Sequence, residues 1–356
     1  MHLQDVQRAI VYSYGLDFLD EEEAILLYDA NNYKNPKFPY HEYERFDLDL
    51  LCDDESNAEF RFFKTELRTL CNQLGLPQTI QTPNRQCFSG IESLCVLLKR
   101  LTYPCHYSDL IPRFGRSVPD LANCFNFTLD FIYNRWGHLL SNFNQPFLSQ
   151  QCLEEYCLKI AQSGAPLINC WGFIDGTVRQ ICRPGQDQKV CYNGHKRVHA
   201  LKFQSILTPN GLIANLYGPV QGNRHDAGIL RDAATLNELS QFSFDRRGEP
   251  LCIYGDPAYP LNVHLQMGFK APVNPAQQQF NAEMSAVRVA VEWGFGKVIE
   301  LFKFIDFKKN LKLHLSPVGK LYVVAVLLTN AHTCFYGSQV SDYFDEEAPA
   351  LENYFQ

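Results

Sequence analysis

The chain has 356 residues, of which 46% are hydrophobic and 20% charged, so it can bury a sizeable core as a globular protein. Its longest apolar runs are too short to cross a bilayer and its first residues are polar, so we expect neither a membrane-spanning helix nor a secretory signal. Thirteen cysteines without a Cys-x-x-Cys pair argue against a disulfide framework and favour a reducing compartment.

The formal net charge of −7 is unevenly distributed along the chain. Residues 1–60 carry 15 acidic and 4 basic residues, and residues 341–356 carry 5 acidic and no basic residues. Residues 61–340 therefore hold 28 basic and 19 acidic residues. A basic central region suits a polyanionic partner, because phosphate contacts supply most non-specific affinity for nucleic acid. An ordinary fluctuation of composition would explain the same excess.

These patterns divide the chain into four parts. We expect an acidic N-terminal extension over 1–60, with one helix near residues 21–30. A helical region follows over 61–165, then a mixed region of strands and helices over 166–340. An acidic C-terminal tail covers 341–356.

The helical region contains the outline of a helix-turn-helix. An amphipathic helix is expected over 91–101. Ser108 is predicted to cap a short helix, Gly115 supplies a tight turn, and Ser117 caps a second helix with Pro119 in its first turn. This pattern is typical both of a DNA-contacting unit and of a packing corner in a helical bundle, and both interpretations stay open.

From about residue 165 short apolar runs predict strands. They are expected over the following ranges: 167–174, 199–207, 212–220, 251–255 and 269–273. The Pro-Asn-Gly sequence at 209–211 predicts a hairpin turn between the second and third strands. Helices are expected over 226–239, with Asp226 as the N-terminal cap, and over 277–304.

Three acidic residues stand out in this region. Asp175 and Asp256 each end an apolar strand, and Glu292 lies on the helix that follows. Carboxyl ends of strands line the crevice at the edge of an open sheet, so the two aspartates can lie side by side. Carboxylates brought together repel one another unless cations neutralise them, and oxygen ligands select Mg²⁺ or Mn²⁺. Two such ions can activate a water for in-line displacement at a phosphodiester.

Each acid also has an ordinary structural interpretation. Asp175 could be a turn residue, Asp256 could terminate a strand, and Glu292 could be solvated or paired with Arg288 one turn earlier. The order of all three on this topology favours the catalytic interpretation.

Asp226 competes with Asp256 for the second acidic position. It follows His225 in the sequence GNRHDAG, at a junction between a loop and a helix. We prefer Asp256, because it follows a strand directly. His225 and Asp226 could still support the ligands or face the substrate.

Four segments together resemble the PIF/Harbinger superfamily of DNA transposases and their domesticated relatives. They are WGFIDGT (171–177), the stretch 192–233 that contains GNRHDAGIL, YGDPAYP (254–260) and VRVAVEWGFGKV (287–298). The resemblance covers residues 170–340, and the upstream helix-turn-helix is also similar to that of the group.

The resemblance implies a ribonuclease-H-like domain, an α/β fold with a five-stranded mixed sheet flanked by helices and preceded by the helical domain. It implies that Asp175 bridges two metal ions, Mg²⁺ or Mn²⁺, while Asp256 binds one and Glu292 the other. The implied activity is nicking of double-stranded DNA at transposon terminal repeats, followed by attack of the freed 3′-hydroxyl on target DNA.

The resemblance also implies a nuclear protein. Such elements tend to encode a separate Myb-like protein that assists DNA binding and nuclear entry, so the chain would stay cytoplasmic until a partner carries it in. A homo-oligomer is compatible with this interpretation, and no membrane is expected as a partner. Residues 303–312 (KFIDFKKNLK) are only a weak localisation signal.

Basic residues near the predicted catalytic strands are candidates for DNA contacts. They are Lys189, His195, Lys196, Arg197, Arg224 and Arg288. A solvated basic loop is the alternative for the segment 193–197. Tyr259 could stack on a base or pack in the core.

Three rival functions follow from the same residues. The first is a domesticated factor that binds DNA or protein without cutting, because a fold does not guarantee its chemistry. The second is a metal-dependent nuclease without strand transfer. The third, a hydrolase of small molecules, is disfavoured by the basic central region.

Overall fold

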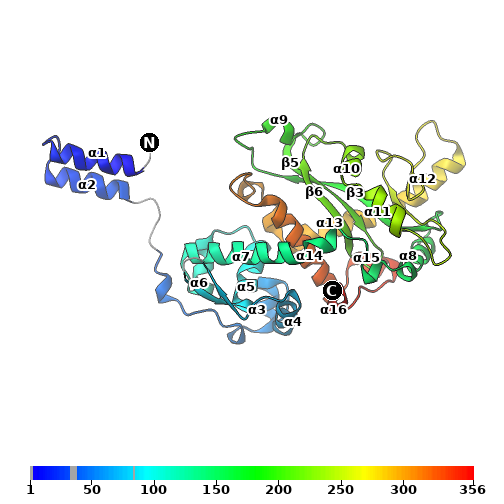
Figure 1. Ribbon diagram of the computed structural model, residues 1–356, viewed down its shortest axis with the longest axis horizontal. Helices are drawn as coiled ribbons and strands as arrows, with labels where there is room; N and C mark the ends of the chain where they lie inside the picture. The colour runs from blue at the N-terminus through cyan, green and yellow to red at the C-terminus, as the bar shows by residue number, and fades with distance from the viewer. Residues whose placement is uncertain (1–2, 33–37, 83–84) are drawn as a thin grey trace.

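The computed structural model describes residues 3–32, 38–82 and 85–356. Two antiparallel N-terminal helices, α1 (Leu3–Gly15) and α2 (Glu21–Asn32), pack against each other and stand apart from the other elements in Figure 1. The sequence predicts the second of these helices. The last part of the acidic segment behaves differently, since Leu48 and Phe60 are buried in the main core.

A helical layer follows. It consists of α3 (Asp53–Phe60), α4 (Lys64–Leu74), the strand pair β1 (Thr79–Gln81) and β2 (Cys87–Ser89), α5 (Gly90–Thr102), α6 (Ile111–Phe114) and α7 (Val118–Trp136). Helix α5 is buried along most of its length and packs against α3 and α7. Its apolar spacing agrees with the amphipathic helix predicted from the sequence.

The corner between α6 and α7 has the local geometry that the sequence predicts. Gly115 adopts a φ of +57°, a conformation that favours glycine, and the Ser117 hydroxyl caps α7 through the Asp120 backbone N–H. The first turn is capped by His106 instead of Ser108, because Asp109 returns to the His106 backbone N–H.

The arginines of this corner are paired within the protein. Arg113 forms ion pairs with Glu55 and Glu59, and the buried Arg116 makes two hydrogen bonds to Glu92, at 2.9 and 2.8 Å. These contacts are those of a packing corner, and the two arginines already have acidic partners.

The second layer is a mixed sheet. Its strands are β3 (Cys170–Gln180), β4 (Tyr192–Asn193), β5 (Val198–Leu207), β6 (Ile213–Gln221), β7 (Cys252–Gly255) and β8 (Leu265–Met267). The order across the sheet is β4-β5-β3-β7-β8, and β6 also pairs with β5. Strands β3, β5 and β6 are antiparallel, whereas β3, β7 and β8 are parallel. This topology, flanked by helices, is compatible with the ribonuclease-H-like expectation.

Two strand predictions need correction. Strand β3 continues through Asp175 to Gln180, because β5 pairs with it over residues 173–180. The fifth predicted strand, 269–273, is not a strand; the fifth along the sheet is Leu265–Met267, which pairs with β7. The hairpin turn at 208–211 is confirmed, and Gly211 there has a φ of +80°.

Helices cover the sheet (Figure 1). Helix α8 (Gln150–Gln162) and α13 (Ala290–Leu301) pack on β3, α9 (Gln188–Cys191) and α10 (Asp226–Asp232) on β5, and α14 (Val318–Tyr336) on β6. The remaining helices of this part of the chain are α11 (Thr235–Phe242), α12 (Pro275–Arg288), α15 (Gln339–Phe344) and α16 (Leu351–Tyr354). The stretch predicted as one helix over 277–304 is divided at Val289 into α12 and α13. Helix α13 packs against β3, which brings it to the candidate site.

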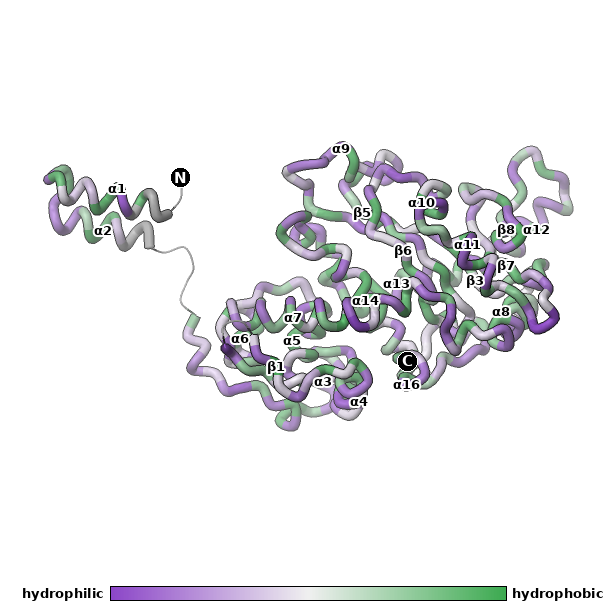
Figure 2. The backbone as a smooth tube through the Cα atoms, viewed as in Figure 1, coloured by the Kyte–Doolittle hydropathy of each residue, from purple (hydrophilic) through white to green (hydrophobic). Residues whose placement is uncertain are grey.

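Helix α14 joins the two layers. It packs against α7, α13 and β6, and Figure 2 shows its apolar residues at the junction between the helical layer and the sheet. It is long and apolar enough to cross a membrane, but 72% of it is buried within the protein, as expected of a core helix. The Asn330 side chain bonds both backbone groups of Ile213 and so fixes α14 to β6.

The acidic C-terminal segment is part of the core. Phe344, Leu351 and Tyr354 are buried, and the Asn330 amide donates a hydrogen bond to the Tyr354 hydroxyl. Its acidic residues therefore lie on elements anchored by apolar side chains.

Candidate active site

The pairing of β3 with β7 places two predicted ligands side by side. Phe173 is opposite Tyr254 in this parallel pair, and Asp175 and Asp256 each follow two residues later. Asp175 continues β3 and Asp256 is the first residue after β7, so the two carboxylates start from neighbouring points of the parallel pair, and the Asp256 charge contributes to the raised pKa of Asp175. The two predicted residues therefore come from adjacent strands, although Asp175 lies within its strand instead of ending it.

The Asp175 carboxylate has two close partners. One oxygen accepts from the Gly176 backbone N–H at 2.7 Å, and the other accepts from the Arg288 guanidinium at 3.2 Å. Burial raises the pKa of Asp175, the Gly176 N–H and Arg288 lower it, and the charges of Asp256 and Asp226 raise it again; the net shift is upward. Asp175 is thus a partly desolvated acid whose negative charge is incompletely compensated.

Asp256 begins the turn after β7. Its carboxylate accepts from the Ala258 backbone N–H at 2.9 Å, and its carbonyl accepts from the Tyr259 N–H at 3.1 Å. These bonds fix the turn that directs the half-buried carboxylate toward the site. The strand-terminating role considered from the sequence is therefore present and is compatible with ligand binding.

Asp226 lies against the other face of β3. A Cβ built on Gly176 would lie 2.8 Å from the Asp226 carboxylate, and Gly176 faces the side of the strand opposite to Asp175. The carboxylate accepts from the Lys202 ammonium at 2.6 Å, and Lys202 also donates to the Arg224 carbonyl at 3.0 Å.

Asp226 is therefore not the helix cap that the sequence predicts. It is the first residue of α10, and His225, which is exposed, occupies the cap position without a side-chain hydrogen bond. The physical reason is competition: a buried ammonium group is a stronger partner for the carboxylate than a backbone N–H.

Tyr259 is buried on this same side of the sheet. It is 1% exposed, and its ring packs against the Cα of Gly255, which excludes stacking on a base. Its hydroxyl has no hydrogen-bond partner among the described residues. Burial and the charges of Asp226, Asp175 and Asp256 all raise the pKa of this hydroxyl, so it stays protonated.

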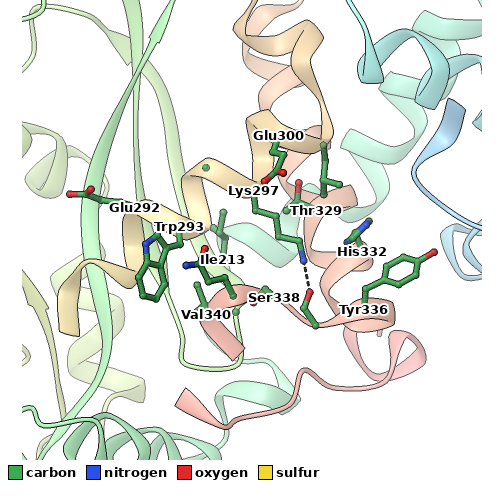
Figure 3. Close-up of a pocket in the computed structure, with 16 residues that line it drawn as sticks. Ile213, Glu292, Trp293, Lys297, Glu300, Thr329, His332, Tyr336, Ser338 and Val340 are labelled. Carbon is green, nitrogen blue, oxygen red and sulfur yellow. Dashed lines mark hydrogen bonds between the residues drawn. The ribbon is translucent and has the colours of Figure 1, made fainter. Parts of the chain in front are cut away.

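Glu292 is not brought to the two aspartates. It is exposed on α13, and Figure 3 shows its carboxylate directed away from Lys297 on the same helix. Across the described ranges, no group of three or more His, Cys, Asp or Glu side chains is close enough to hold a metal ion. The predicted convergence of three carboxylates is therefore absent there. Arg288, one turn earlier, contacts Asp175 instead of pairing with Glu292.

A cavity of about 470 Å³, with Glu292 among its lining residues, lies between α13 and the end of α14. Lys297 donates to the Thr333 hydroxyl at 2.9 Å and to the Gly337 carbonyl at 2.6 Å (Figure 3). Burial lowers the pKa of Lys297 to about 8 and that of His332 to about 3. These contacts hold the C-terminal end of α14 to α13.

The predicted DNA-contacting residues fall into two groups. Lys189, His195, Lys196 and Arg197 are exposed on α9 and on the turn between β4 and β5. Arg224 and Arg288 already have acidic partners, Asp232 and Asp175 respectively. The first group is free to meet solvent or substrate, whereas Arg288 is part of the candidate site itself.

Sequence reasoning missed two polar residues of β5 close to the site. Lys202 is buried and holds Asp226, and Ser205 lies directly opposite Asp175 with a buried hydroxyl that has no partner among the described residues. The signal for both is present in the sequence, because Lys202 and Ser205, like Gln204 between them, are polar residues within the strand segment HALKFQSIL.

The oxygen donors of Asp175 and Asp256 suit a hard divalent cation. Asp175 and Asp256 supply only oxygen donors from one edge of the sheet, and the raised pKa of Asp175 reflects a charge that a cation would compensate. Ser205 adds, beside Asp175, a hydroxyl oxygen that has no hydrogen-bond partner in the described part of the chain. The third predicted ligand, Glu292, belongs to a helix that packs on the same strand.

Of three comparisons with known proteins, the one with protein families gave a match. No curated protein and no solved structure matches the chain significantly. Residues 174–330 match the family described as DDE superfamily endonuclease, a range that contains Asp175, Asp256 and Glu292 and supports a nuclease of the transposase type in general.

Proposed function

We propose that this chain is a divalent-metal-dependent DNA endonuclease whose first two metal ligands are Asp175 and Asp256. The observation that supports the proposal is the parallel pairing of β3 with β7, in which Phe173 is opposite Tyr254, two residues before Asp175 and Asp256 respectively. The family match over residues 174–330 supports the same class of chemistry.

The two aspartates would hold Mg²⁺ or Mn²⁺, two ions when the site is complete. Such ions activate a water and stabilise the leaving oxygen of a phosphodiester. Asp256 is the better second ligand than Asp226, because Asp226 faces the opposite side of β3 and is neutralised by Lys202. Glu292 is the third candidate ligand, and Arg288, one turn before it, forms an ion pair with Asp175.

Nicking of supercoiled DNA tests this proposal. The full chain is incubated with Mg²⁺, Mn²⁺ or EDTA, and the conversion of supercoiled to relaxed plasmid is measured. We expect metal-dependent nicking that falls at least a hundredfold in Asp175→Asn and Asp256→Asn, because removing a ligand of a catalytic cation removes several kcal/mol of transition-state stabilisation.

The third ligand has a matched control on its own helix. Glu292→Gln is compared with Glu300→Gln, which changes another exposed glutamate of α13. Loss of nicking in the first variant alone supports Glu292 as a ligand. Nicking that persists at the wild-type rate in both aspartate variants would contradict the proposed site.

A DNA-binding factor without cleavage is the second candidate function. The ion pair between Arg288 and Asp175, together with the exposed position of Glu292, favours it. Tight DNA binding without nicking in any divalent metal would support this function over the nuclease.

The finer features implied by the PIF/Harbinger resemblance belong to the same proposal. They are cleavage at transposon terminal repeats, strand transfer to target DNA by the 3′-hydroxyl, and nuclear entry with a Myb-like partner. DNA carrying candidate terminal repeats, offered together with a target plasmid, distinguishes strand transfer from simple nicking. Joined products support a transposase, whereas nicks alone support a nuclease without strand transfer.

A further inference from the structure

Two segments far apart in the sequence carry similar charge. Residues 183–197 contain four basic residues and one acidic residue, and residues 303–312 have the same composition. The first segment holds most of the DNA-contacting residues predicted from the sequence. The second is remote from them in the chain and, by its sequence alone, is only a weak localisation signal.

The fold brings these segments together at the end of β3. The Ile181 backbone N–H donates to the His199 carbonyl at 2.9 Å, and the next N–H, that of Cys182, donates to the Leu311 carbonyl at 2.9 Å. Two consecutive residues therefore hold the turn 194–197 and the segment 308–312 beside each other. We call the two segments together the basic surface.

The second segment is firmly anchored, although its lysines are exposed. Leu311 is 2% exposed, and the preceding Phe304 and Ile305 are buried. Asp306 lies 4.0 Å from the buried guanidinium of Arg179 on β3. Because these anchors fix the backbone, Lys308 and Lys309 on the short helix η7 (Lys308–Asn310), together with Lys312, project from a defined position.

The basic surface lies close enough to the candidate site for one DNA duplex to contact both. Asp175 and Ile181 are six residues apart in sequence along the extended β3 backbone, which corresponds to about 20 Å. This length matches about six base pairs of duplex, at a rise of about 3.4 Å for each. DNA with its scissile phosphate at Asp175 could therefore reach the lysines within roughly half a helical turn.

We propose that Lys308, Lys309 and Lys312 complete a surface that binds the phosphate backbone of duplex DNA beside the cleavage site. The inference rests on the proposed function only in taking DNA as the substrate. Exposed lysines on an anchored segment suit contacts with phosphates, which position a duplex without reading its sequence.

Salt-dependent DNA binding tests the surface. Binding of a fluorescein-labelled duplex to the full chain is followed by anisotropy at several salt concentrations, without divalent metal and in the Asp175→Asn background. We expect Lys308→Gln/Lys309→Gln to weaken binding roughly tenfold or more at moderate salt. The slope of log affinity against log salt should fall by about 2, because each lost phosphate contact removes about 0.9.

A matched double variant provides the control. Arg247→Gln/Lys270→Gln removes the same charge from exposed positions, and Lys270 follows β8, on the opposite edge of the sheet from β4. We expect this variant to keep the parental slope. Equal losses in the two double variants would overturn the surface, whereas absence of DNA binding by the parent chain would contradict the proposed function itself.

Discussion

The surroundings of Asp175 at the candidate site disfavour the ionised form of its carboxylate. Burial and the charges of Asp256 and Asp226 oppose its ionisation, while the Gly176 N–H and Arg288 favour it, and the pKa is raised overall. A carboxylate that destabilises the native state in its ionised form is typical of functional positions, where the cost is retained for binding or chemistry.

Replacing Asp175 by Asn should therefore stabilise the protein at neutral pH. The raised pKa means that the native state binds the proton more tightly than the unfolded state, so wild-type stability falls as pH rises from 3.8, the ordinary value, through the native pKa. The advantage of the Asn variant should be complete at neutral pH and shrink as pH falls toward 3.8.

Urea unfolding of the wild type and of Asp175→Asn, measured at neutral pH and near pH 5, checks this sign. The nicking assay on the same samples shows whether the gain in stability accompanies loss of function. A lower unfolding midpoint for Asp175→Asn at neutral pH would contradict the raised pKa.

At the scale of elements, Lys202 connects the sheet to α10. Its ammonium is on β5, and its bonds to the Asp226 carboxylate and the Arg224 carbonyl fix both the start of α10 and the loop before it. The Lys202 side chain is 8% exposed, whereas that of Asp226 is 28% exposed. The stability of the charged Lys202 ammonium therefore depends more on its protein hydrogen bonds than that of the more exposed Asp226 carboxylate does.

Lys202→Met keeps the volume of the side chain but removes both bonds. We expect it to lower the free energy of unfolding by about 1.5–3 kcal/mol, the usual contribution of hydrogen bonds to charged groups. Lys270→Met, at an exposed position, is the control and should change little. Equal unfolding midpoints for the two variants would show that the Lys202 bonds contribute nothing to stability.

The elements that the sequence predicted well are those with local signals. The cap at Ser117, the turns at Gly115 and Gly211, and the apolar spacing of α5 each depend on a few neighbouring residues. Strand limits depend on partners instead. Strand β3 extends past Asp175 because β5 is long enough to pair with it, and this length is not encoded within the β3 segment itself.

The candidate site likewise contains residues that local sequence signals indicate and residues whose positions depend on packing. Asp175 and Asp256 could be singled out because each follows an apolar run, and the strands that contain these runs are adjacent and parallel. The places of Asp226 and Arg288 depend on how α10 and α12 pack on the sheet, and spacing along the chain does not determine that packing.

For the whole molecule, the distribution of charge agrees with a nucleic-acid partner. The excess of basic residues lies in the central part of the chain, and the fold gathers part of it into the basic surface at one end of β3. The acidic excess belongs to residues 1–60, from the N-terminal helices to α3, and to a C-terminal segment whose apolar residues are in the core. The net charge of the whole chain, −7, would by itself argue against a nucleic-acid partner.

The most direct test of the proposed site is the binding of Mn²⁺ to the full chain, measured by calorimetry. Wild type and Asp226→Asn should bind Mn²⁺ with similar affinity, whereas Asp175→Asn and Asp256→Asn should each lose measurable binding, because two ligands of one site act together. Unchanged binding in Asp256→Asn together with loss in Asp226→Asn would contradict the proposed pair and place the second ligand on α10.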